Sequence, residues 1–148
     1  MSAVSEIMSP KGVITLRGNF TPTALDAVKV MLKNKVGSVV VVDSGGRPEG
    51  IVTERDILRL VAKSKKRADE TPAGEIMTSP VITAKTYDSV DTVANMMVKN
   101  KVKRIVLVED DGTMAGVISV TDIAKNLSKI LSDDYKRYRS LGTAISFR

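Results

Sequence analysis

The stretch GIVTERDIL at residues 50–58 returns in similar form as GVISVTDIA at residues 116–124. Each copy has a Gly and two apolar residues, then a Thr or Ser, two variable residues, an Asp and another apolar residue. This order predicts the end of a buried strand, followed directly by the start of an amphipathic helix. A repeat of this kind decides the architecture before any other feature, because both copies must form the same local structure.

The repeat extends well beyond these nine residues. SEIM at residues 5–8 matches GEIM at residues 74–77, and KNKVGSVVVVD at residues 33–43 matches KNKVKRIVLVE at residues 99–109. Two Pro-containing segments complete the alignment, SPKGVIT at residues 9–15 and SPVIT at residues 79–83. The chain is therefore a tandem repeat over most of its length.

Both copies predict the same order of elements, strand-helix-strand-strand-helix. The helices are predicted from apolar residues at helical spacing, the inner strands from continuous apolar runs that are typical of strands buried on both faces, and the hairpins from Gly-containing turns. The predicted elements are short strands at 13–15 and 81–83, helices at 23–35 and 89–101, inner strands at 39–42 and 105–108, and third strands that end at Thr53 and Ser119.

The Thr/Ser-x-x-Asp part of the repeat has two interpretations. As a helix cap, the hydroxyl and the acid satisfy free amide groups and contribute about 1 kcal/mol. As a ligand site, the helix start presents amide groups to an anion, while the Asp accepts hydrogen bonds from a ribose diol. In the second interpretation Gly50 and Gly116 let a ligand approach the backbone.

Composition excludes several kinds of site. The chain has no Cys and no His, so disulfides, Cys/His zinc sites and Ser-His-Asp or Cys-His catalysis are excluded. A net charge of +6 favours anionic partners, but only 3% of the residues are aromatic, which is few for stacking single-stranded bases. No apolar run is long enough to span a membrane and no secretory pattern begins the chain. We therefore expect a cytoplasmic protein.

These motifs together resemble the tandem CBS-domain (cystathionine-β-synthase-type) regulatory module, over residues 4–60 and 73–131. The resemblance implies an α/β (α+β) fold of two β-α-β-β-α repeats, packed about a pseudo-two-fold axis with two clefts between them. It also implies an adenosine-containing effector, such as AMP, ADP, ATP or S-adenosylmethionine, with no required cofactor, no metal and no catalytic residue.

The resemblance implies a set of ligand-binding residues. The motif residues that would hold phosphate and ribose are Thr53 with Asp56, and Ser119 with Asp122; Arg55 and Thr121 lie inside the same motifs. The adenine pocket would be lined by Ile14, Val81 and Ile82. The starts of the inner strands would also face a cleft, through Val36 and Ser38 or through Lys103 and Arg104. We expect Lys103 and Arg104 to complete the Thr53/Asp56 site, and the two clefts to differ in phosphate affinity.

We therefore predict a first repeat at residues 1–66, a linker at 67–72, a second repeat at 73–131 and a basic tail at 132–148. The predicted function is a non-catalytic adenine-nucleotide sensor that forms a homodimer, a disc of four repeats, and acts on an unknown protein. One alternative is a nucleic-acid-binding accessory protein that uses its basic surface. Another is an enzyme acting on a nucleotide, although no paired carboxylates support it.

Overall fold

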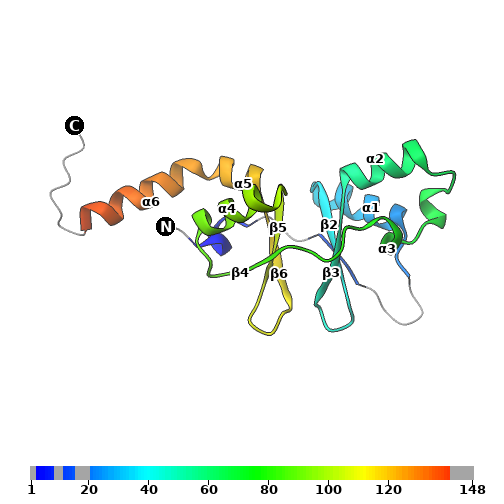
Figure 1. Ribbon diagram of the computed structural model, residues 1–148, viewed down its shortest axis with the longest axis horizontal. Coiled ribbons are helices and arrows are strands. Elements are labelled where there is room, and N and C mark those ends of the chain that lie inside the picture. The colour runs from blue at the N-terminus through cyan, green and yellow to red at the C-terminus, as the bar shows by residue number, and fades with distance from the viewer. Residues whose placement is uncertain (1–2, 9–11, 16–20, 141–148) are drawn as a thin grey trace.

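A computed structural model describes residues 3–8, 12–15 and 21–140 of the chain. Two three-stranded sheets stand side by side at its centre, and the helices cover their outer faces (Figure 1). The first sheet consists of β1 (Val13–Thr15), β2 (Ser38–Val42) and β3 (Pro48–Thr53), and the second of β4 (Thr83–Lys85), β5 (Arg104–Val108) and β6 (Met114–Ser119).

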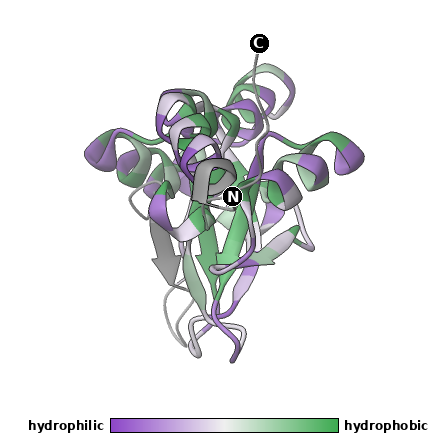
Figure 2. Cartoon of the chain, turned by 90° about the vertical axis from the view of Figure 1, so that its left-hand side faces the viewer, coloured by the Kyte–Doolittle hydropathy of each residue, from purple (hydrophilic) through white to green (hydrophobic). Residues whose placement is uncertain are grey.

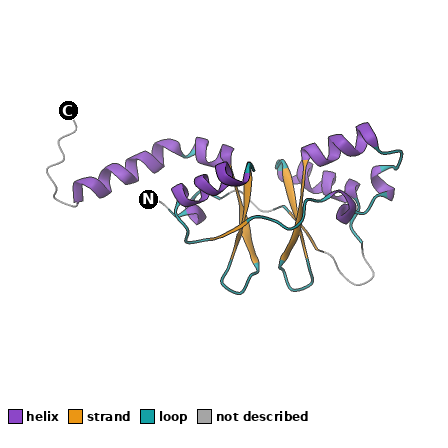
Figure 3. Cartoon of the chain, in the orientation of Figure 1, coloured by secondary structure: helices purple, strands orange, loops and turns teal. Residues whose placement is uncertain are grey.

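The helices divide between the two sheets (Figure 3). Outside the first sheet lie α1 (Ala24–Asn34), α2 (Glu54–Lys63), the short η2 (Ala68–Glu70) and α3 (Ala73–Ile76). Outside the second lie η1 (Val4–Glu6), α4 (Val90–Asn100), α5 (Val120–Lys125) and α6 (Leu127–Ser140). The predicted mixed α and β fold and the order of elements are confirmed. No helix of the described ranges is long and apolar enough to cross a membrane.

The sheets have the same topology, and their inner strands β2 and β5 are buried on both faces. In each, the first strand pairs parallel with the second, and the second pairs antiparallel with the third. Along β2, Val39 and Val41 pack toward the helices, whereas Val40 and Val42 pack into a cluster shared with the opposite sheet. Beyond their first residues, Ser38 and Arg104, the inner strands therefore have no polar face, as their continuous apolar runs predict. Figure 2 shows this hydrophobic centre.

The two sequence repeats exchange their first segments. Val4 and Ile7 are buried in the core around α4 and the second sheet, although they precede the first repeat's own strands. Conversely, Ala73 is buried in the core around α1 and the first sheet. The segment at residues 5–8 of the first repeat therefore packs against the second sheet, and the matching segment at residues 74–77 packs against the first sheet.

The exchange explains the repeated Gly, and the expectation that a ligand approaches the backbone there is wrong. A Cβ built on Gly116 would lie 2.6 Å from the sulfur of Met8. A Cβ on Gly50 would overlap Met77 in the same way. Each Gly thus admits a Met side chain that arrives from the other repeat, and not a ligand.

Two predicted elements differ from the structure. The strand predicted at residues 81–83 is assigned from Thr83, because Val81 packs between the sheets and regular pairing begins only where the Val106 amide donates to the Ile82 carbonyl, at 3.1 Å. At the other end, α6 continues the helical part of the chain to Ser140, well into the predicted tail. Residues 141–148 of that tail lie outside the described part.

Candidate functional site

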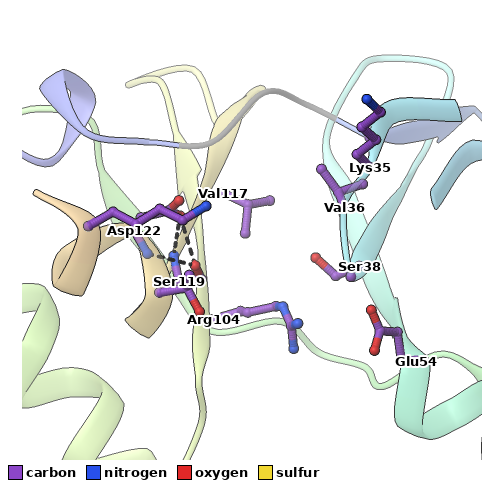
Figure 4. Close-up of a pocket in the computed structure, with 12 residues that line it drawn as sticks. Lys35, Val36, Ser38, Glu54, Arg104, Val117, Ser119 and Asp122 are labelled. Carbon is purple, nitrogen blue, oxygen red and sulfur yellow. Dashed lines mark hydrogen bonds between the residues drawn. The ribbon is translucent and has the colours of Figure 1, made fainter. Parts of the chain in front are cut away.

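A cavity of about 220 Å³ lies between the two repeats. Its walls come from two places in the sequence: the turn from α1 into β2 with the start of α2, and the second sheet with the start of α5. The lining residues are Gly12, Lys35, Val36, Gly37, Ser38 and Glu54 from the first repeat, and Arg104, Val117, Ser119, Thr121, Asp122 and Lys125 from the second. Figure 4 shows the two groups facing one another across this cleft.

The second-repeat wall is held by a capping box. The Ser119 amide donates to Asp122 Oδ2 at 2.7 Å, and its hydroxyl donates to the same oxygen at 2.9 Å. The Asp122 amide returns a hydrogen bond to Ser119 Oγ at 3.1 Å. The cap therefore fixes the positions of both side chains at the edge of the cleft. The structural interpretation of the motif is confirmed, and the ligand-binding interpretation stays a prediction.

The first-repeat wall is a tight turn that ends α1. Lys35 adopts a left-handed conformation with φ of 53°, and the Val36 amide donates to the Met31 carbonyl at 3.0 Å. One residue further on, the Gly37 carbonyl accepts a hydrogen bond from the Glu54 amide at 3.2 Å. The turn and the first residue of α2 are thereby held together on one side of the cleft.

Two side chains of opposite charge lie close to Gly37. A Cβ built on this residue would lie 2.7 Å from Arg104 Nη2 and 2.9 Å from Glu54 Oε1. The guanidinium of the second repeat and the carboxylate of the first therefore both lie close to the place that a Gly37 side chain would take. They are near enough for their charges to interact, although they form no ion pair with one another. The missing side chain of Gly37 provides the space that they occupy.

The charge of the cleft suits an anion beside a polar sugar. Its cationic side chains are Lys35, Arg104 and Lys125, and its acidic side chains are Glu54 and Asp122. The Ser119 amide and hydroxyl both donate to Asp122 Oδ2, so these two hydrogen bonds of the cap use one of the two carboxylate oxygens.

Six of the thirteen predicted residues come together in this cleft. They are Val36, Ser38, Arg104, Ser119, Thr121 and Asp122. Val81 and Ile82 instead pack against the apolar clusters between and behind the sheets. Arg55 and Lys103 are exposed and are not part of its lining. The side chain of Ile14 lies outside the described part of the structure.

Thr53 and Asp56 lie elsewhere. The Thr53 amide donates to Asp56 Oδ2 at 2.8 Å in the capping box of α2. Asp56 is only 6% exposed, lies 3.7 Å from Arg59 Nη1, and lines a different hollow of about 490 Å³ between α2 and α3. The two copies of the motif therefore have different surroundings.

We expected Arg104 to complete a Thr53/Asp56 site, but it belongs instead to the cleft of Ser119 and Asp122. The reason is the register of the β5–β6 hairpin, which pairs Arg104 directly with Ser119. The same register pairs Ser38 with Thr53 in the first sheet. An irregularity between Leu107 and Val108 shifts this register by one residue. Counting outward from the turn at Gly112 would therefore have placed Arg104 opposite Ile118, and the sequence alone does not show that it pairs with Ser119.

The cleft contains residues that the sequence interpretation missed. Val117 precedes Ser119 by two positions on the same face of β6, and Lys125 follows Asp122 by three positions on α5, so strand and helix periods could have found both. The position of Lys35 could not be predicted, because a left-handed residue at the end of a helix is usually Gly. Among the residues described, no cluster of acidic side chains is placed to hold a metal ion.

A family model for the CBS domain matches the chain twice, at residues 4–63 and 73–129. The chain belongs to the CBS-domain family. Its two matches correspond to the two repeats and leave the linker and the end of α6 outside.

Solved CBS structures have the same fold. The CBS domain protein PAE2072 from Pyrobaculum aerophilum, solved with AMP, is 30% identical with a TM-score of 0.74 over 88% of this chain and 99% of that one. The CBS domain pair of protein MJ0100, solved with 5′-methylthioadenosine and S-adenosyl-L-methionine, is 30% identical with a TM-score of 0.72 over 86% of this chain and 97% of that one.

Curated relatives are longer than this chain. An uncharacterized protein of Methanopyrus kandleri is 36% identical over 76% of this chain and 57% of its own length. The mitochondrial CBS domain-containing protein CBSX3 of Arabidopsis thaliana is 32% identical over 84% of this chain and 64% of its own length. The chain thus spans less than two thirds of these relatives.

Proposed function

We propose that this CBS pair is a non-catalytic sensor that binds an adenosine-containing ligand in the cleft between Val36–Ser38 and the start of α5. The observation that carries the proposal is the cross-repeat cleft itself. It places the Ser119/Asp122 pair, suited to a ribose, beside Arg104. Two relatives of 30% identity that were solved with adenosine compounds support the same ligand class.

A cleft built from both repeats also provides a way to report occupancy. A ligand that touches Ser38 on one side and Asp122 on the other holds the two repeats together. Binding to the folded state alone stabilises it by about 2.7 kcal/mol at a ligand concentration of 100 times Kd. We propose that this stabilised arrangement is what a regulated partner recognises, in the cytoplasm.

The ligand class is tested by calorimetry with AMP, adenosine and GMP on the wild type and on Arg104→Ala. A charge-assisted hydrogen bond contributes about 1.5–3 kcal/mol, so AMP affinity should fall about 10- to 100-fold in the variant. Adenosine has no phosphate and should bind both proteins equally. Lys103→Ala is the matched control, because Lys103 is the neighbouring exposed cation outside the cleft lining.

If neither AMP nor adenosine binds the wild type at millimolar concentration, the sensor function is wrong. Equal losses of AMP and adenosine in Arg104→Ala would instead mean that Arg104 supports the fold or the base and not the phosphate.

We also propose that the protein is a homodimer that buries the groove between α1 and α2. This groove of about 580 Å³ is mostly apolar and includes Val28, Leu32 and Leu58. Leu32 is 74% exposed, Leu58 is 68% exposed and the nearby Val61 is 75% exposed. Three large aliphatic side chains this exposed on adjoining helices favour an interface.

A further inference from the structure

Among the described residues, Glu54 is the one acidic residue of the cleft's first-repeat wall, and the proposed function does not use it. It is the first residue of α2, and its carboxylate and the Arg104 guanidinium both lie within 3.0 Å of the place that a Gly37 Cβ would take. An anionic group that approaches Arg104 from the cleft therefore meets a negative charge already in place. Glu54 is also exposed, so no burial requirement explains a carboxylate at this point.

The second repeat indicates that the fold does not require an acid here. Val120 takes the place of Glu54 at the start of α5. Its amide donates to the Lys103 carbonyl at 3.0 Å, just as the Glu54 amide donates to the Gly37 carbonyl. The backbone is thus the same in both copies with an apolar or an acidic side chain. The carboxylate is a feature of this cleft and not of the helix start.

The two repeats also differ at the position of Gly37. Its counterpart in the second repeat is Lys103, whose long side chain is exposed. At position 37 even a Cβ would approach Arg104 and Glu54 within 3.0 Å. The first repeat therefore combines an acid at position 54 with the absence of a side chain at position 37. The space left at Gly37 lets the Glu54 carboxylate and the Arg104 guanidinium approach the same place.

We propose that Glu54 is a selectivity residue that lowers the affinity of the cleft for phosphate-bearing adenosine ligands. Its charge offsets that of Arg104, so a phosphate gains less from the guanidinium than it would gain alone. An adenosine ligand with an uncharged tail is unaffected by either charge. This inference rests on the proposed function, because it concerns the selectivity of the same cleft.

The test compares AMP with 5′-methylthioadenosine, which carries no phosphate, by calorimetry on the wild type and on Glu54→Gln. Removing one nearby negative charge should raise AMP affinity about tenfold and leave 5′-methylthioadenosine affinity within about twofold. Glu54→Val, which copies the second repeat, should behave in the same way. Glu70→Gln is the matched control, because it makes the same change in net charge at an exposed position of η2.

A second background separates this effect from a general change in the fold. In Arg104→Ala the gain from Glu54→Gln should shrink to about twofold, since the charge that Glu54 offsets is gone. An unchanged ratio of AMP to 5′-methylthioadenosine affinity in Glu54→Gln, with both ligands still binding, would overturn the role of Glu54 and leave the sensor function intact. Failure of both ligands to bind every variant and the wild type would overturn the sensor function itself.

Discussion

At the scale of single residues, the same capping geometry occurs inside and outside the cleft. Thr23 and Asp26 form a capping box at α1, with the Thr23 amide 2.8 Å from Asp26 Oδ2 and the Asp26 amide 3.2 Å from Thr23 Oγ1. Ser119 and Asp122 form one with nearly equal distances at α5. Only the second pair lines the cleft. Substitutions in the two pairs can therefore distinguish the contribution of a cap to stability from the contribution of the acid to ligand binding.

We expect Asp26→Ala and Asp122→Ala to lower the free energy of unfolding by a similar amount, about 1 kcal/mol, the usual cost of a lost cap. Only Asp122→Ala should weaken adenosine, by about tenfold or more, because a ribose loses a charged acceptor. Chemical denaturation measures the first quantity and calorimetry the second. Equal adenosine affinity in the two variants would mean that the Ser119/Asp122 motif is a cap and nothing more.

At the scale of elements, the two long helices of the repeats end in the same unusual way. α1 ends at Lys35 and α4 at Lys101, both left-handed with φ of 53° and 55°. This conformation is costly for a residue with a side chain and natural for Gly. The two ends differ in position, because Lys35 lines the cleft and Lys101 does not.

Lys35→Gly and Lys101→Gly should each raise the free energy of unfolding slightly, by about 0.5 kcal/mol, since relief of backbone strain exceeds the entropy cost of Gly. AMP affinity should fall about threefold in Lys35→Gly alone, the value of a solvent-exposed charge near the phosphate. Thermal unfolding and calorimetry on both proteins check this. An equal loss of AMP affinity in Lys101→Gly would show that the effect does not come from the cleft.

At the scale of the whole molecule, the proposed dimer interface lies beside the cleft. The groove between α1 and α2 shares Lys35, Val36, Gly37 and Glu54 with the cleft. Whatever covers the groove would therefore touch the same turn that a ligand in the proposed site would touch. A dimer through this face would place each cleft next to the interface.

Leu58→Glu should convert the dimer into a monomer, because it puts a charge in the apolar groove. Light scattering at micromolar concentration should give twice the chain mass of 16.0 kDa for the wild type and one chain mass for the variant. Leu58 is 68% exposed, so the fold itself should change by about 0.5 kcal/mol or less. Leu131→Glu, at an exposed Leu of α6 that is 59% accessible, is the control. A monomeric wild type contradicts the proposal.

The sequence by itself determined the repeat, the order of elements and the capping boxes. These features depend on residues close together in the chain: the apolar runs of β2 and β5, the turns at Gly46 and Gly112, and the Ser119/Asp122 spacing. Each repeat supplies its own periodicity and its own helix start. Local physics is sufficient for such features, so they were predicted correctly.

Only the tertiary structure decided which segments of two similar repeats meet. Met8 packs on Gly116 and Met77 on Gly50, yet each could in sequence terms have packed within its own repeat. For the same reason Arg104 was assigned to the Thr53/Asp56 motif, whereas it faces Glu54 across the Ser119/Asp122 cleft. Contacts between repeats depend on how the two sheets face each other. Equivalent residues of the two repeats have similar local sequences, so the sequence around a residue does not show whether its partner lies in the same repeat or in the other one.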